Sequence, residues 1–144
     1  MDCSRGGPGG YDKLLLATGA SPRTLPLPGG DRHRVFYLRR IEDCEQLQFA
    51  LSAGSRVVII GAGISGLAAA VYAASEGLDV LVIESTSPGG QAGSSSKIEN
   101  YRGFQTGISG QEVASREFAQ PEKLGAERMT AKGATRLDGD RTTY

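Results

Sequence analysis

The chain has 144 residues, which is enough for one domain with a buried core. Its sixteen basic and sixteen acidic residues cancel, so its charge points neither to a nucleic-acid partner nor to an anionic membrane. Glycine, at 21 residues, is about twice as frequent as in average proteins, which predicts many turns.

The chain before residue 55 is expected to hold two strands, a linker and a helix. Five of residues 1–10 are Gly or Pro, which predicts disorder. The apolar run Tyr11–Ala17 predicts a buried strand. Residues 21–34 carry three prolines and are expected to form an extended linker. Val35–Leu38 is expected to be a short strand, and Ile41–Ser52 has the apolar spacing of a helix.

Residues 56–84 carry the most informative pattern. A short apolar strand, Val57–Ile60, leads into the G-x-G-x-x-G segment Gly61–Gly66, an Ala-rich helix and a second strand, Val80–Ile83. A G-x-G-x-x-G segment that follows a strand and opens a helix is typical of a dinucleotide-binding βαβ unit. The expected fold is therefore α/β, with a Rossmann-like parallel sheet. The alternative is an ordinary Gly-rich turn between a strand and a helix.

Each residue of this turn has an expected role. Gly61 makes the tight turn, Gly63 lets the backbone approach a pyrophosphate, and Gly66 lets the helix pack closely on the strand. Amides at the start of the helix, among them those of Ile64 and Ser65, are expected to face the phosphates, because a helix N-terminus attracts anions.

Glu84 follows the second strand, 18 residues after Gly66. This is the place of the acid that hydrogen-bonds an adenosine ribose, and a carboxylate there repels a 2′-phosphate. The site therefore favours FAD or NAD over NADP. The uncharged run Val57–Ser75 has the length of a membrane helix, but three glycines and a serine interrupt it, so no membrane segment is expected.

After Glu84 the sequence predicts a long Gly- and Ser-rich loop over 85–108 and a capped helix over 109–124. Weak alternation over 126–131 and 134–137 predicts strands, and Asp138-Gly139 is a hairpin signal.

Two resemblances divide the chain. Residues 11–56, with Leu16-Ala17-Thr18-Gly19, resemble ferredoxin-reductase-type flavoproteins, in which the Ala-Thr-Gly segment closes the FAD domain and the next G-x-G-x-x-G opens the NAD domain. Residues 57–137 resemble the FAD-binding part of low-molecular-weight thioredoxin reductases. The segments that carry this second, more specific resemblance are Gly61–Gly66, Glu84, Pro88–Gln91, Glu99–Phe104 and Thr106–Gly110.

The second resemblance implies FAD as the cofactor, with NAD as the alternative at the same turn. By that resemblance, Gly89, Gly90, Gln91 and Asn100 lie against the flavin or its ribityl chain. For Tyr101 and Phe104, plain packing is at least as good an interpretation as ring contact.

The chain departs from the second family at Arg102 and Gln105, where that family has an apolar residue and a proline. It also lacks that family's C-x-x-C, because its two cysteines, Cys3 and Cys44, are far apart. We therefore expect an incomplete Rossmann-like domain over 55–144, preceded by a ferredoxin-reductase-like segment over 11–54. Cys44 is expected to be a small buried hydrophobic residue.

The expected function is that of an FAD-binding oxidoreductase in which electrons pass from NAD(P)H to flavin in the intact enzyme, with a thioredoxin-like or ferredoxin-like redox partner. The alternatives are a non-catalytic dinucleotide-binding module and an inactive fragment. No catalytic acid, base or nucleophile and no metal ligands are expected. The N-terminal ten residues lack the apolar core of a signal peptide, so a cytoplasmic location is expected.

Overall fold

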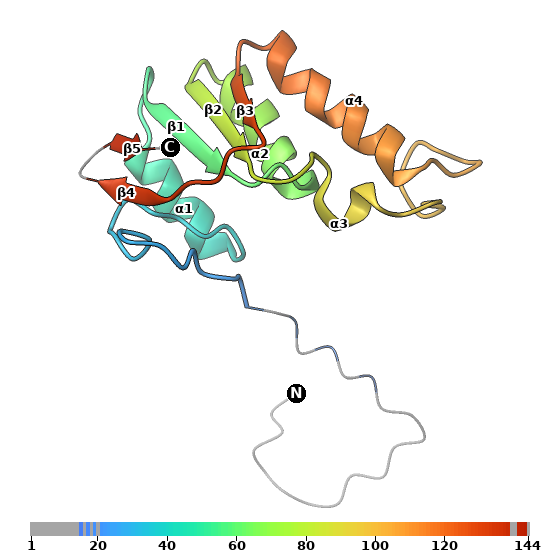
Figure 1. The fold of residues 1–144 in the computed structure, drawn as a ribbon, viewed down its shortest axis with the longest axis horizontal. Helices are drawn as coiled ribbons and strands as arrows, with labels where there is room; N and C mark the ends of the chain where they lie inside the picture. The colour runs from blue at the N-terminus through green and yellow to red at the C-terminus, as the bar shows by residue number, and fades with distance from the viewer. Residues whose placement is uncertain (1–14, 16, 18, 20, 139–140, 144) are drawn as a thin grey trace, which may run out of the picture.

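The computed structural model describes residues 15, 17, 19, 21–138 and 141–143 (Figure 1). Its elements in chain order are α1 Ile41–Ala50, β1 Arg56–Ile60, α2 Ile64–Ser75, β2 Asp79–Glu84, α3 Gly90–Gly93, α4 Gly110–Lys123, β3 Glu127–Thr130, β4 Arg136–Asp138 and β5 Arg141–Thr143.

The centre of the fold is a three-stranded parallel sheet in the order β1-β2-β3. β1 and β2 are in register from Arg56 opposite Asp79 to Ile60 opposite Ile83. Helix α2 joins these two strands, as parallel pairing requires a crossover. The prediction of an α/β fold with a βαβ unit around the glycine turn is confirmed.

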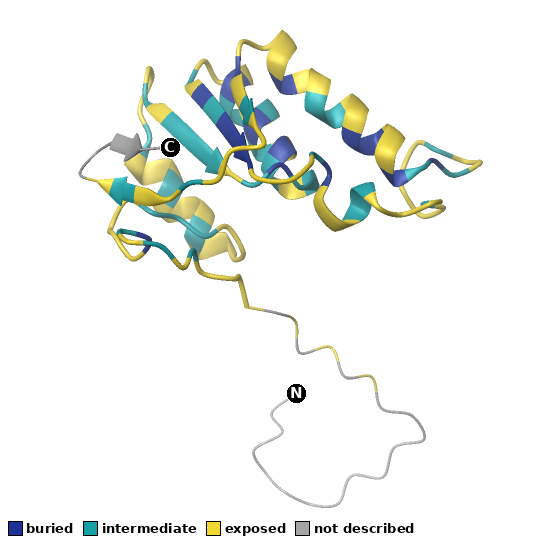
Figure 2. Ribbon diagram, in the orientation of Figure 1, coloured by how far each residue is buried: buried dark blue, intermediate teal, exposed yellow. Residues whose placement is uncertain are grey.

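The core lies between the sheet and helix α2, and α4 packs against α2 beside it (Figures 1 and 2). The fully buried side chains of Leu67 in α2 and Val80 in β2 form part of it, together with Ala70, which has no exposed surface. Small alanines on the inner face of α2, Ala70 and Ala74, let the helix pack closely on the strands.

Helix α4 begins and ends much as the sequence predicts. The Ser109 hydroxyl accepts a hydrogen bond of 3.1 Å from the amide of Glu112, and Gly125 follows the helix with a φ of +91°. Pro121 lies in the last turn and is buried. Pro121 has no N–H group to donate to residue 117, and the helix ends two residues later, at Lys123.

Two expectations for residues 21–38 are wrong. Val35–Leu38 is not a strand. Instead the Tyr37 hydroxyl accepts from the amide of Leu25 at 2.8 Å and donates to the carbonyl of Gly30 at 3.0 Å. These bonds fold the Pro-rich residues 21–34 back in turns over 27–34, so this segment is not extended throughout. In this way a side chain replaces the backbone pairing that a strand would have needed.

The expected strand Tyr11–Ala17 falls mostly outside the described residues, as do residues 1–10. Of that strand, Leu15 and Ala17 are described, and both are exposed and outside any strand. Cys44 lies on α1 and is exposed, so the prediction that it is buried is wrong. The expected loop over 85–108 contains one helical turn, α3.

The C-terminal strands contact the Pro-rich segment near the start of the chain. β4 and β5 pair antiparallel, as the hairpin signal predicts. The amide of Leu137 donates to the carbonyl of Pro28 at 2.9 Å, and Arg32 lies 3.7 Å from the Asp138 carboxylate. The segment 27–34 and the hairpin are far apart in sequence but are joined by this hydrogen bond and this ion pair. None of the helices in the described part of the chain has the length and apolar content to span a membrane.

Candidate functional site

The glycine turn lies at the carboxyl end of β1, where ligands bind in open α/β sheets. Gly61 has a φ of +104°, a conformation that favours glycine, and its amide donates to the carbonyl of Ile83 at 2.8 Å. A Cβ on Gly66 would lie 2.1 Å from the Gly61 carbonyl oxygen. Gly61 and Gly66 are thus required by the shape of the turn itself.

Gly63 differs from both of these glycines. It is the N-cap of α2, with an extended backbone (φ −70°, ψ 170°) and no side-chain cap. A Cβ built on Gly63 would meet no atom within 4 Å. The fold therefore does not require a glycine here, and the space beside it is open. The first-turn amides of a helix lack partners within the helix, and here they adjoin that open space, with Ser65 exposed and Ile64 half-buried.

Glu84 is a buried acid at the end of β2, with 8% of its surface exposed. Its Oε2 accepts from the amide of Ala62 at 2.7 Å, and its Oε1 accepts from the amide of Thr86 at 2.8 Å. Ala62 has no exposed surface, so this carboxylate satisfies a buried N–H group inside the turn. Each carboxylate oxygen retains a further lone pair for another donor. The sequence predicts the position of this acid, but it does not predict the hydrogen bond that Glu84 accepts from Ala62 in the turn.

Gly89 and Gly90 lie directly on the glycine turn. The amide of Gly89 donates to the Ala62 carbonyl at 2.6 Å, and Gly89 and Gly63 form an isolated parallel bridge. A Cβ on Gly90 would lie 3.3 Å from the Gly63 Cα. The structure thus brings together two segments that only the family resemblance, and no spacing rule, had associated.

Gln91 and Asn100 are not brought to the turn in the same way. Gln91 is exposed on α3, and Asn100 is exposed in the loop 99–107, which paired hydrogen bonds between Ile98 and Ile108 close at its base. This loop extends beyond the N-terminal end of α4 in Figure 1. Within the described residues, no hydrogen bond joins Asn100 to the glycine turn.

Tyr101 and Phe104 pack on α4. Their rings stack with centroids 5.8 Å apart, and the Arg116 guanidinium lies 5.4 Å from the centroid of Phe104. The Tyr101 hydroxyl donates to the carboxylate of Glu117. This hydrogen bond, with partial burial and the charge of the carboxylate, raises the pKa of Tyr101 above its ordinary value of 10.0. These contacts agree with the packing interpretation of the two rings.

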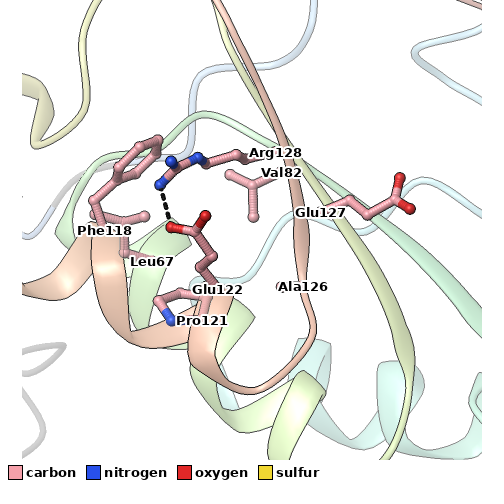
Figure 3. Close-up of a pocket in the computed structure, with 8 residues that line it drawn as sticks. All are labelled: Leu67, Val82, Phe118, Pro121, Glu122, Ala126, Glu127 and Arg128. Carbon is pink, nitrogen blue, oxygen red and sulfur yellow. Dashed lines mark ion pairs between the residues drawn. The ribbon is translucent and has the colours of Figure 1, made fainter.

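A small cavity of about 10 Å³ lies between α2, β2, α4 and β3 (Figure 3). Arg128 is one of its lining residues, with its guanidinium 4.8 Å from the ring centroid of Phe118 and 2.6 Å from Glu122. The cavity has room for about one water molecule, and none of the predicted cofactor residues lines it. The candidate site is therefore the open glycine turn. Among the described residues, no cluster of His, Cys, Asp or Glu suits a metal ion.

Two family models match this chain, and they overlap at the glycine turn. The model of the pyridine nucleotide-disulphide oxidoreductases matches residues 3–88, and that of the FAD dependent oxidoreductases matches residues 56–128. With more than half of its length matched by the first, the chain belongs to the pyridine nucleotide-disulphide oxidoreductase family. The predictions of this superfamily and of FAD as its cofactor are confirmed.

Relatives of both predicted kinds are found. Rhodocoxin reductase of Rhodococcus erythropolis is 37% identical over 90% of this chain and 30% of its own length. Thioredoxin reductase of Bacillus subtilis is 45% identical over 49% of this chain and 22% of its own length. Among solved structures, the ferredoxin reductase for the CYP199A2 system of Rhodopseudomonas palustris matches with a TM-score of 0.69 and 29% identity, over 92% of this chain and 30% of that one. The chain thus spans less than a third of these relatives.

Proposed function

We propose that this chain holds FAD at the glycine turn, as part of an oxidoreductase in which electrons pass from NAD(P)H to flavin and on to a redox protein partner. The observation that carries the proposal is the open space at Gly63. The turn keeps glycine there although its own packing does not need one. A pyrophosphate can approach the backbone only where no Cβ occupies the space beside it, and a glycine at this position leaves that space open.

In this proposal the turn binds FAD through its backbone. The amides of Gly63, Ile64, Ser65 and Gly66 face the pyrophosphate, with the positive end of the α2 dipole behind them. Gly61 shapes the turn. The same backbone approach explains why this site depends on glycines and not on cationic side chains.

Glu84 binds the adenosine ribose through the lone pairs that its two backbone hydrogen bonds leave available. Gly89 and Gly90 form the second wall of the cradle, and Gln91 and Asn100 approach the flavin side of the ligand. For Gln91 and Asn100 the support is the family resemblance alone, since both side chains are exposed.

FAD, when bound, supplies the hydride and electron chemistry, and the protein orients it. The chain's own residues bind and position the cofactor through the turn, and no residue of the chain is proposed as an acid, base or nucleophile. The proposed unit for this task is 55–144, with 11–54 as a preceding segment.

The test is the visible absorption of the purified chain after incubation with FAD and removal of free cofactor. Retained flavin absorbance that NADH bleaches supports the whole proposal. Retained absorbance without bleaching supports FAD binding and contradicts reduction by this chain alone. The absence of retained flavin, in a chain that unfolds cooperatively, contradicts FAD binding.

A second candidate is NAD at the same turn. Its support is that the matches to rhodocoxin reductase and to the ferredoxin reductase structure continue upstream of the turn and cover about nine-tenths of the chain. In ferredoxin-reductase-type flavoproteins, which residues 11–56 resemble, the G-x-G-x-x-G after the Ala-Thr-Gly segment opens the NAD domain. Equilibrium titration with FAD and NAD separates the candidates, and tighter binding of NAD selects the second.

The proposed partner is a small redox protein of the ferredoxin or rubredoxin kind. Its support is that rubredoxin-NAD(+) reductase of Pseudomonas putida is 45% identical over 51% of this chain, and that a reductase solved in covalent complex with putidaredoxin has a TM-score of 0.66 at 25% identity.

A further inference from the structure

Helix α4 reaches the glycine turn through one intermediate layer. The buried residue Gly89 lies between Ala114 of α4 and the carbonyl of Ala62 in the turn. On one side, a Cβ on Gly89 would lie 2.4 Å from the Cβ of Ala114. On the other, the Gly89 amide donates to Ala62 at 2.6 Å. Ala114 and Ala62 are themselves 4% and 0% exposed. The three residues are therefore closely packed, with no space for a larger side chain between them.

The register of α4 against this loop is set by contacts next to Ala114. A Cβ on Gly110 would lie 1.7 Å from the carbonyl oxygen of Ala92, and the Gly110 amide donates to Ser95 at 2.8 Å. One turn further along α4, the side chain of residue 114 therefore faces Gly89 at a fixed distance. A methyl group added to the side chain at 114 would therefore contact Gly89 and displace it toward the glycine turn.

We propose that Ala114 is a positioning residue for the dinucleotide cradle. A side chain no larger than its methyl group leaves Gly89 and Gly90 in place against Gly63, and so preserves the width of the space that receives the pyrophosphate. This inference rests on the proposed function, because it gives a role in FAD binding to a residue that touches only the cradle wall. Neither the family motifs nor the spacing of the glycines points to residue 114.

The variants Ala114→Gly and Ala114→Val separate positioning from helix stability. Glycine has a lower helix propensity than valine, so a role only in the stability of α4 predicts that Ala114→Gly is the more harmful of the two. Positioning predicts the reverse, because glycine leaves the space free and valine fills it. The matched control is Ala74→Val, which adds the same atoms to a buried alanine of α2 in the core, away from Gly89.

The experiment is equilibrium titration of the four proteins with FAD, together with amide hydrogen exchange at Gly89 without ligand. We expect Ala114→Val to weaken FAD binding by about tenfold or more, and Ala114→Gly and Ala74→Val to change it by less than about threefold. Exchange at Gly89 should accelerate in Ala114→Val alone, because its bond to Ala62 is displaced.

Three results overturn the inference. The first is an FAD affinity of Ala114→Val equal to that of Ala74→Val, the second is weaker FAD binding by Ala114→Gly than by Ala114→Val, and the third is unchanged exchange at Gly89 in Ala114→Val. If the parent takes up no FAD, the proposed function falls and this role for Ala114 falls with it. Normal uptake by the parent with any of the three results overturns the role of Ala114 alone.

Discussion

The backbone amide of Ala62 donates a hydrogen bond of 2.7 Å to Oε2 of Glu84. This bond joins the middle of the glycine turn to the end of the neighbouring strand, and Ala62 is completely buried. The acid proposed to hold the ribose therefore also holds the turn in shape. Its loss should act on stability and on binding together, and the two effects are separable by experiment.

Replacement of Glu84 by alanine should lower the free energy of unfolding by about 1–3 kcal/mol without any ligand, because the buried amide of Ala62 is left unpaired. Denaturant unfolding of the ligand-free chain measures this. The control is Glu76→Ala, at an exposed acid after α2, which should change stability by less than about 0.5 kcal/mol. Equal stability of the two variants would show that the bond from Ala62 has no structural weight.

Gly66→Ala should destabilise the chain by about 1–3 kcal/mol, because the added methyl group meets the Gly61 carbonyl oxygen in a closely packed turn. Gly63→Ala is the matched control. It adds the same methyl group three residues earlier, at the N-cap, where nothing lies within 4 Å, and should cost less than about 1 kcal/mol as a weaker N-cap. Thermal unfolding of both variants decides the order, and a larger loss for Gly63→Ala contradicts the geometry of the turn.

The Tyr101–Glu117 hydrogen bond predicts a loss of stability in alkali. The folded chain raises the pKa of Tyr101, so this contribution is complete below the ordinary value of 10.0 and is lost as the pH rises through the raised value. Tyr101→Phe should remove this alkaline step and cost less than about 1 kcal/mol at neutral pH, since the site is partly solvated. Tyr72→Phe, at an exposed tyrosine of α2, should keep the step, and a step of the same size in Tyr101→Phe contradicts its assignment.

Asp43 predicts the opposite dependence in acid. Hydrogen bonds from the amides of Arg40 and Arg39 hold the pKa of Asp43 below its ordinary value of 3.8. Its stabilisation of the start of α1 is therefore present above that value and is lost as the pH falls through the lowered one. The protection factor of the Arg40 amide, the ratio of its unstructured exchange rate to its observed rate at the same pH, should fall in that acid range. Asp43→Ala, which has no side-chain acceptor, should show low protection already at neutral pH. High protection of Arg40 in Asp43→Ala at neutral pH contradicts this cap.

The β1-α2-β2 unit was predictable because its signals are local. A β-branched run, a glycine turn and an alanine-rich helix each specify one element, and the right-handed crossover that such units almost always adopt then joins them. The capped start of α4 at Ser109 was predictable for the same reason, since the hydroxyl and the amide that it accepts from are three residues apart.

The errors arise where distant residues decide. Val35–Leu38 has the composition of a strand, but strand formation needs a partner, and the hydroxyl of Tyr37 is instead engaged by Leu25 and Gly30. Two further contacts join residues more than twenty positions apart, namely the hydrogen bond from Ala62 to Glu84 and the packing of Gly89 against Ala114. No spacing rule in the sequence encodes either contact. The position of Asn100 at the flavin stays a prediction.

The central claim is that the backbone at Gly63 receives the pyrophosphate of FAD, and the FAD affinity of Gly63→Val tests it most directly. The branched side chain enters a space that is empty in the fold but filled in the proposed complex. We predict that the parent chain binds FAD and that Gly63→Val binds it at least about a hundredfold more weakly, with its thermal unfolding close to that of the parent. Equal FAD affinity of the folded variant and the parent would contradict the account.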